Sequence, residues 1–158
     1  MRLNRLFKRK IYEKLLEWKR RSKGRTALLI EGARRVGKST IVEVFGKNEY
    51  KSYVIVDFMK PNKKVLSAIL DHPDDLSVFF NELSFAYNVV LHERETLIVF
   101  DEVQRCPEAR QLLKALVGDG RYDYVETGSL ISIRMNVKDI TIPSEEEAIG
   151  MYPMDSSA

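Results

Sequence analysis

The segment Gly32–Ser39 reads Gly-Ala-Arg-Arg-Val-Gly-Lys-Ser and constrains the fold more than any other feature of this sequence. It matches G-x-x-x-x-G-K-[ST], the Walker A pattern of a phosphate-binding loop. A short apolar run, Thr26–Ile30, precedes it, and apolar residues at helical spacing follow from Ile41. A strand, a glycine-framed loop and a helix in this order predict a P-loop at the carboxyl end of a buried strand.

The residue types inside the motif suit the binding of a phosphate group. Gly32 and Gly37 permit backbone conformations closed to other residues, so that successive N–H groups can point into one concavity. A helix that begins near Lys38 directs the positive end of its dipole to the same place, and the Lys38 ammonium adds a charge for the β- and γ-phosphates. The Ser39 hydroxyl is the expected protein ligand of Mg²⁺.

The residues expected to contact the nucleotide extend one position beyond the motif. They are Gly32, Ala33, Arg34, Arg35, Val36, Gly37, Lys38, Ser39 and Thr40. One of the two arginines is expected to meet a phosphate, and a solvent-facing side chain is an equal alternative for Arg35. Lys38 is also assigned a catalytic role, because a cation at this place stabilises the transferred phosphoryl group.

Two acidic residues follow the apolar run Leu97–Phe100, which has the composition of a buried strand. Such a strand delivers Asp101 and Glu102 to the carboxyl edge of the sheet, where ligands of open α/β folds bind. Asp101 is the expected Mg²⁺ ligand, and Glu102 is the expected general base for the attacking water, as in a Walker B strand. Apolar strands often end in aspartate, so this pair alone is a weak signal. The P-loop earlier in the sequence is what supports its assignment as a Walker B strand.

Thr127-Gly128-Ser129 ends another apolar run. We assign Ser129 to the nucleotide site, where its hydroxyl would sense the γ-phosphate or hold the attacking water. A cap between strand and helix is an equal alternative, because serine and threonine are ordinary cap residues. Asp57, at the end of a further predicted strand, either supports the metal site or caps a loop, and the loop cap is favoured.

Strands and helices alternate along the chain. Strands are expected over residues 26–30, 52–58, 96–100 and 122–126, with short ones over 139–142 and 149–152 on either side of an acidic run. Helices are expected from residue 3 to about 24, from 38 to 46, between Pro61 and Pro73, from 74 to 91 and from 108 to 117. This alternation predicts an α/β fold with a mainly parallel sheet.

Composition limits the class of protein. A chain of 158 residues with 44% hydrophobic and 31% charged residues is one domain with a real core. No apolar run is long enough to cross a bilayer, and the charged N-terminus lacks the apolar core of a secretory signal. The single cysteine, Cys106, suits a reducing cytosol. We therefore expect a cytoplasmic protein without membrane contact, and assign no chemistry to Cys106, His72 or His92.

The charge is unevenly distributed. Residues 1–25 hold eleven Lys/Arg and two acidic residues, a net charge of +9, whereas the remaining residues carry −6. The same segment carries an apolar stripe at helical spacing, formed by Leu3, Phe7, Ile11, Leu15 and Trp18. The basic surface predicts a weak contact with DNA or an acidic protein partner. A merely solvated helix face is the favoured alternative.

Three segments, Gly32–Thr40, Phe100–Pro107 and Glu126–Leu130, together resemble the prokaryotic AAA-type P-loop ATPases. The second segment reads Phe-Asp-Glu-Val-Gln-Arg-Cys-Pro, and its Asp-Glu-Val-Gln makes the match specific. The resemblance implies a three-layer α/β/α fold with a five-stranded sheet in the order 5-1-4-3-2. It also implies ATP and Mg²⁺ as ligands, and it supports the roles given above to Lys38, Ser39, Asp101, Glu102 and Ser129.

We divide the chain into a basic amphipathic helix, residues 1–25, and a P-loop ATPase core, residues 26–158. The resemblance implies a helical lid and a further domain after the core, so we expect this core to be truncated. Neither Arg105 nor Arg134 is a confident arginine finger, and the loss of such a finger slows related reactions by about 10³- to 10⁵-fold.

The sequence therefore predicts binding of ATP with Mg²⁺ and slow hydrolysis. A nucleotide-dependent module that contacts DNA or a protein through the basic helix, without significant turnover, is the alternative. A third interpretation is a fragment with a bare surface that another domain once covered. The oligomeric state stays open, with a homo-oligomer among the alternatives. Guanine specificity is not expected, because Asn62-Lys63-Lys64-Val65 lacks the acid of the guanine-reading pattern.

Overall fold

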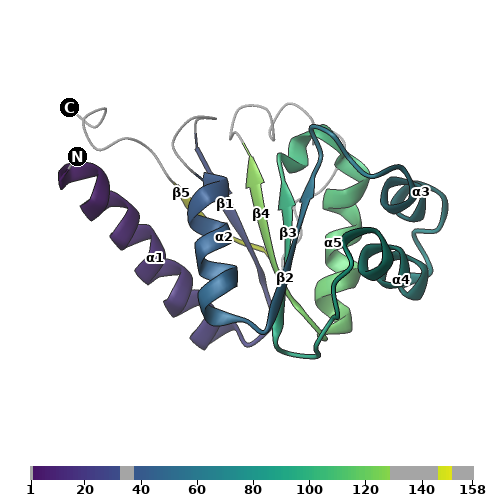
Figure 1. Ribbon diagram of the computed structural model, residues 1–158, viewed down its shortest axis with the longest axis horizontal. Coiled ribbons are helices and arrows are strands. Elements are labelled where there is room, and N and C mark those ends of the chain that lie inside the picture. Colours follow the sequence, from purple (N-terminus) through teal and green to yellow (C-terminus); the bar gives the residue numbers. More distant parts are fainter. Residues whose placement is uncertain (1, 33–37, 129–145, 151–158) are drawn as a thin grey trace.

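The structure is a computed structural model that describes residues 2–32, 38–128 and 146–150. Five parallel strands form one sheet in the order β2-β3-β4-β1-β5, which confirms the predicted order (Figure 1). The strands are β1 (Ala27–Glu31), β2 (Ser52–Asp57), β3 (Thr96–Asp101), β4 (Asp123–Gly128) and β5 (Glu146–Gly150). The helices are α1 (Arg2–Ser22), α2 (Lys38–Glu49), α3 (Lys63–Asp71), α4 (Leu76–Tyr87) and α5 (Pro107–Asp119), with a 3₁₀ turn η1 (Val103–Arg105).

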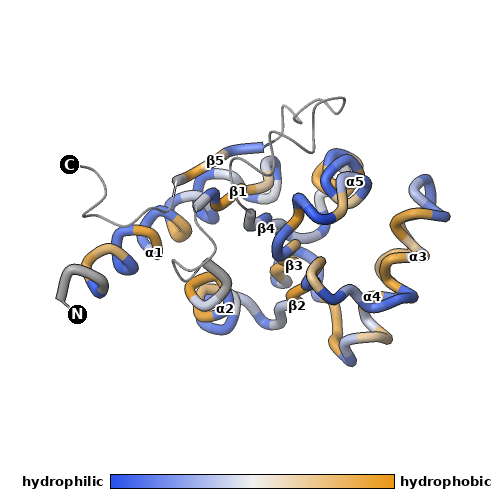
Figure 2. Tube along the Cα trace, turned by 90° about the horizontal axis from the view of Figure 1, so that it is seen from above, coloured by the Kyte–Doolittle hydropathy of each residue, from blue (hydrophilic) through white to orange (hydrophobic). Residues whose placement is uncertain are grey.

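Helices cover both faces of the sheet, which gives three layers. Seen from above, α1 and α2 lie on one side, and α3, α4 and α5 lie on the other (Figure 2). Each side has its own hydrophobic core, because strand side chains alternate between the two faces. Val125 belongs to the α1/α2 core, whereas its neighbour Tyr124 belongs to the core under α5. The predicted α/β/α architecture is therefore confirmed.

Helix α1 buries one stripe and exposes its basic residues. Ile11, Leu15 and Trp18 are buried against the α2 side of the sheet. The Trp18 indole N–H donates to Thr26 Oγ1 at 3.2 Å, and its ring lies 6.5 Å from the Phe45 ring between centroids. Most of its lysines and arginines are exposed to solvent. None of the described helices combines the length and hydropathy that crossing a lipid bilayer requires.

Helix α2 continues past Gly46, where the sequence predicted it to end. A Cβ atom at Gly46 would lie 2.9 Å from Tyr53 Cβ, so glycine allows the helix to pack closely on β2. The prediction was wrong because this glycine serves packing and not helix termination. Helix α4 is shorter than predicted: Asp75 caps its start, and Asn88, at φ 49°, ends it.

Strand β5 begins inside the acidic run, which the sequence analysis placed between two strands. Glu146 Oε1 accepts a hydrogen bond from Arg110 of α5 at 2.9 Å. Glu147, on the other face, accepts from Arg21 of α1 and from Thr26 Oγ1, each at 2.7 Å. These partners explain how adjacent glutamates enter a sheet, and the expected start at Ile149 was wrong. Residues 139–142 and 151–152 lie outside the described part.

Arg110 lies between two carboxyl groups in the interior. Its side chain is 1% exposed, that of Glu126 is 0% exposed and that of Glu146 is 4% exposed. Arg110 Nη1 lies 3.4 Å from Glu126 Oε1, so one cation faces two acids. Burial raises the pKa of Glu126 well above its ordinary value, and the adjacent Glu146 raises it further, while Arg110 lowers it. Glu126 is therefore the group that favours the protonated form.

Candidate functional site

The strands that carry the predicted site residues end at one edge of the sheet. β1, β4 and β3 are adjacent and parallel, with Glu31 opposite Gly128 in the pairing of β1 with β4. Their carboxyl ends point to the top of Figure 1, where α2 begins at Lys38. The P-loop strand, the Asp-Glu strand and the Thr-Gly-Ser strand therefore meet where open α/β sheets bind ligands.

The backbone of Gly32 connects two of these strand ends. Its N–H donates to the Gly128 carbonyl at 3.2 Å, so the first residue of the P-loop motif lies beside the last residue of β4. Six of the predicted nucleotide-contacting residues lie outside the described residues: Ala33, Arg34, Arg35, Val36, Gly37 and Ser129. The first turn of α2 consists of Lys38, Ser39 and Thr40. The structure describes the backbone of all three residues but not the side chains of Lys38 and Ser39.

Thr127 joins both acidic residues to β4. Its hydroxyl donates to Asp101 Oδ1 at 2.5 Å and accepts from the Glu102 backbone N–H at 3.1 Å. The side chain is fully buried, and the residue lies in β4, so it does not cap a helix. The resemblance placed Thr127 to Ser129 on the strand that senses the nucleotide, and of these only Ser129 was assigned to the site. The contacts of Thr127 with Asp101 and Glu102 were not predicted. The signal is the alignment of β3 with β4, which places Thr127 beside Asp101.

Glu102 turns the chain directly after β3. Its backbone is left-handed, at φ 56° and ψ 50°, a conformation that is uncommon for residues other than glycine. The side chain lies within the protein, with the residue 8% exposed. Gln104, in the 3₁₀ turn η1, donates from Nε2 to Glu102 Oε2 at 2.6 Å. Both the backbone and the carboxylate of Glu102 are therefore held by specific hydrogen bonds.

The Asp101 carboxylate at this edge is the kind of oxygen group that Mg²⁺ binds. Mg²⁺ keeps several waters and is usually bound by one or two protein oxygens together with substrate phosphates. Asp101 supplies a carboxylate here, and Ser39 at the start of α2 is the second predicted ligand. Within the described ranges there is no group of three or more His, Cys, Asp or Glu residues that could form an all-protein metal site.

The structure also places several residues that the sequence analysis left outside the predicted site. Asp57 Oδ1 accepts from the Met59 N–H at 2.9 Å, which confirms the favoured prediction of a loop cap. Cys106 is buried, and burial raises the pKa of its thiol. His72 is exposed and His92 is half-buried. Arg105 is exposed, and Arg134 lies outside the described part of the chain.

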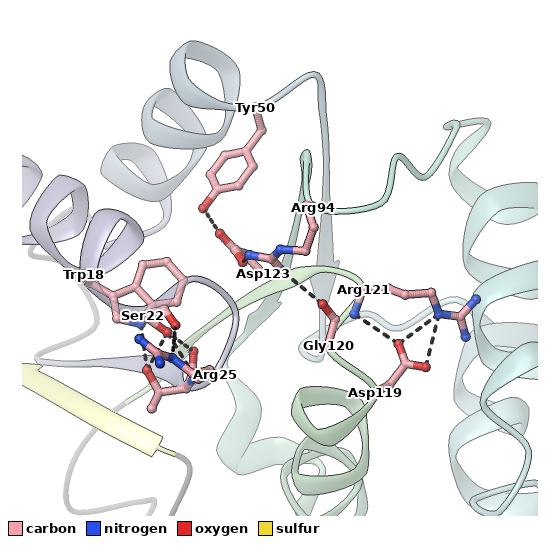
Figure 3. Close-up of polar contacts among 10 residues, drawn as sticks. Trp18, Ser22, Arg25, Tyr50, Arg94, Asp119, Gly120, Arg121 and Asp123 are labelled. Carbon is pink, nitrogen blue, oxygen red and sulfur yellow. Dashed lines mark hydrogen bonds and ion pairs between the residues drawn. The ribbon is translucent and has the colours of Figure 1, made fainter.

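A second polar cluster lies near the amino end of β4, away from the site. Asp123 accepts from Tyr50 and from Arg94, each at 2.5 Å, and Arg94 also donates to the Gly120 carbonyl at 3.1 Å (Figure 3). Burial and the nearby Asp123 carboxylate raise the pKa of Tyr50. This cluster joins three connecting segments at the opposite edge of the sheet, so we assign it to stability.

Solved structures with a similar fold include chains from two structures of Drosophila ORC bound to DNA. A chain of Drosophila ORC bound to GC-rich DNA and Cdc6 has 10% identity and a TM-score of 0.57, and the match covers 96% of this chain and 58% of that one. A chain of Drosophila ORC bound to DNA has 13% identity and a TM-score of 0.55, with 96% and 93% covered. These identities establish the fold alone, and this chain spans little more than half the length of the first.

The sequence itself identifies the family. It matches no curated protein. The sequence profile of a family described as an AAA domain matches residues 24–157, which is most of the chain and includes all three strand ends of the site. The chain therefore belongs to the AAA domain family and contains an AAA-type P-loop ATPase core, the fold of a nucleotide-binding protein.

Proposed function

We propose that the protein binds ATP with Mg²⁺ at the carboxyl edge of β1, β4 and β3 and hydrolyses the ATP slowly. The observation that carries the proposal is the placement of Thr127. Its hydroxyl holds Asp101 and the Glu102 backbone together, one strand away from the end of β1 that leads into the P-loop. An acid pair held in this way beside a P-loop has the parts that phosphoryl transfer requires.

Each predicted residue has a defined task in this reaction. The loop from Gly32 to Thr40 would surround the phosphates, and Lys38 would stabilise the charge of the transferred phosphoryl group. Asp101 and Ser39 would hold Mg²⁺, which neutralises phosphate charge. Glu102 would accept a proton from the attacking water. Ser129 would contact the γ-phosphate from the segment after β4.

Thermal shift and single-turnover hydrolysis test this proposal. ATP with Mg²⁺ should raise the melting temperature of the parent, because a ligand that binds only the folded state stabilises it. Lys38→Ala should abolish that rise, whereas Lys47→Ala, an exposed position near the end of the same helix, should keep it. Glu102→Gln should keep the rise and lose hydrolysis by about 10²- to 10⁴-fold. A rise in Lys38→Ala equal to that of the parent would refute the site.

The basic face of α1 supports a second function, weak binding of nucleic acid. Arg5, Arg9, Lys10 and Lys14 are exposed, while Ile11, Leu15 and Trp18 of the same helix are buried in the core. Such a surface neutralises phosphates without reading sequence. Two structures of Drosophila ORC with the same fold contain bound DNA, although that fact concerns ORC.

The test replaces charges and keeps the helix. Deletion of α1 would remove Ile11, Leu15 and Trp18 from the core, so that lost binding and lost folding could not be separated. The variant Arg5→Gln/Arg9→Gln/Lys10→Gln/Lys14→Gln is compared with Lys60→Gln/Lys63→Gln/Lys64→Gln/Lys114→Gln, four exposed lysines elsewhere. Anisotropy with a labelled DNA duplex at low salt should show weaker binding and a smaller salt dependence only in the α1 variant. Equal binding by both variants would reject the α1 surface.

A further inference from the structure

The contact between Gln104 and Glu102 has no role in the function proposed above. The two residues are separated by only one position, and the amide Nε2 of Gln104 donates to Glu102 Oε2 at 2.6 Å. Both side chains belong to the buried part of the protein, with Gln104 9% exposed. A hydrogen bond to a carboxylate in such surroundings is stronger than one at the surface, because less water competes for the partners.

Two separate hydrogen bonds fix Glu102. Thr127 accepts from its backbone N–H, which anchors the residue to β4 in its left-handed conformation. Gln104 then fixes the far end of the side chain through one carboxylate oxygen. For the other oxygen, Oε1, no hydrogen bond is present among the described residues, so this atom can accept a proton or a water molecule.

A neutral donor suits a general base better than a cation does. An arginine or lysine at this position would form an ion pair and lower the proton affinity of the carboxylate. The glutamine amide orients the carboxylate through one N–H group and adds no net charge. Its place in η1, directly after the turn at Glu102, keeps the donor on the same short segment as the base.

We infer that Gln104 is a positioning residue for ATP hydrolysis: it holds Glu102 Oε2 so that Oε1 faces the attacking water. The inference rests on the proposed function of Glu102 as general base. Gln104 itself would touch neither ATP nor Mg²⁺. Its loss should therefore lower the rate of the chemical step and leave nucleotide affinity unchanged, because misplacement of a catalytic group by about 1 Å can cost on the order of 10²-fold.

Gln104→Met is the informative variant, because methionine keeps the length of the side chain and removes the N–H donor. The matched control is Gln111→Met, the same change at an exposed position in α5. We expect a single-turnover rate about 10- to 100-fold below the parent in Gln104→Met, with an unchanged Kd for ATP. Gln111→Met should match the parent in both quantities. The combination of Gln104→Met with Glu102→Gln should be no slower than Glu102→Gln alone, because both act through one carboxylate.

The possible outcomes separate this inference from the proposed function. If Glu102→Gln loses hydrolysis while Gln104→Met hydrolyses ATP at the parent rate, the positioning role is wrong and the site stands. If the parent binds no ATP, or binds it without hydrolysis in a single-turnover experiment, both statements fail. A raised Kd for ATP in Gln104→Met with an unchanged rate also overturns the inference. Should Gln104→Met fail to fold by circular dichroism, Gln104→Ala, which only removes atoms, takes its place.

Discussion

Thr127 Oγ1 lies 2.5 Å from Asp101 Oδ1, so a hydroxyl of one strand supports a carboxylate at the end of the next. The same hydroxyl accepts the N–H of Glu102 at 3.1 Å. Because all three groups are wholly or partly buried, the contact sets where both acids lie relative to the P-loop strand.

Thr127→Val keeps the shape of the side chain and removes both hydrogen bonds. The backbone N–H of Glu102 then loses its hydrogen-bond acceptor, the Thr127 hydroxyl. A buried N–H group without an acceptor costs about 1–3 kcal/mol of stability. We expect a loss of unfolding free energy of this size in urea denaturation, together with weaker Mg²⁺-dependent ATP binding. Thr127→Ser keeps the hydroxyl and should retain ATP binding. Equal ATP affinity in Thr127→Val and the parent would show that the contact serves stability alone.

Asp101→Asn removes a negative charge from the predicted Mg²⁺ site with little change in size. ATP affinity in the presence of Mg²⁺ should fall by at least about tenfold, or about 1.4 kcal/mol. Affinity in the presence of EDTA should change little, because the carboxylate acts through the metal. Titrations with and without Mg²⁺ measure both quantities. A loss of the same size under the two conditions would count against Asp101 as a metal ligand.

Glu126 predicts how stability depends on pH. Its pKa in the folded protein is raised above the ordinary value of 4.5 by burial and by Glu146. The unfolded chain therefore releases the Glu126 proton at lower pH than the folded protein does. As the pH rises from about 4.5 through the folded pKa, the free energy of unfolding falls, because the folded protein must then bury a charged carboxylate. Urea denaturation across this range should show a decline that is reduced in Glu126→Gln. Glu93→Gln, at an exposed position, should keep the decline of the parent.

Two glycines inside helices should respond to alanine in opposite ways. Gly46→Ala places a Cβ 2.9 Å from Tyr53 Cβ, so we expect a destabilisation of about 1–3 kcal/mol despite the better helix propensity of alanine. At Gly118, in α5, the new Cβ of an alanine would have no described atom within 4 Å beyond its chain neighbours and the backbone of its own helix, so Gly118→Ala should gain up to about 1 kcal/mol. Thermal and urea unfolding of both variants measure the difference. A stabilised Gly46→Ala would mean that α2 and β2 can separate at little cost.

Most of the fold could be predicted because its signals are local. The apolar run before Asp101 and the helical spacing of Ile11, Leu15 and Trp18 each report one element and the face that it buries. The sequence motifs also predicted which strands would end in polar residues. The order of the strands came from the resemblance, since periodicity within a strand does not identify its neighbours.

The parts that were missed depend on contacts distant in sequence. Glu146 was predicted to lie between strands, because its buried partner Arg110 is 36 positions away in the sequence. Gly46 was predicted to end a helix, because its close contact with Tyr53 of β2 cannot be seen in the sequence. Thr127 and Ser129 could not be ranked without the pairing of β3 and β4. In the sequence, Gln104 is only one residue of the Asp-Glu-Val-Gln motif. Its contact with the Glu102 carboxylate depends on the left-handed backbone at Glu102, which the sequence does not show.

The position of β5 has a consequence for the order in which the sheet can form. β2 pairs with β3 through residues 44 positions apart, such as Ser52 and Thr96, whereas β1 pairs with β5 through residues 119 positions apart, such as Ala27 and Glu146. Closing longer loops costs more entropy, and folds that depend on distant pairings form more slowly. The strand that leads into the P-loop therefore gains its second neighbour only after β5, residues 146–150, has been synthesised, so we expect binding at the proposed nucleotide site to develop late in folding.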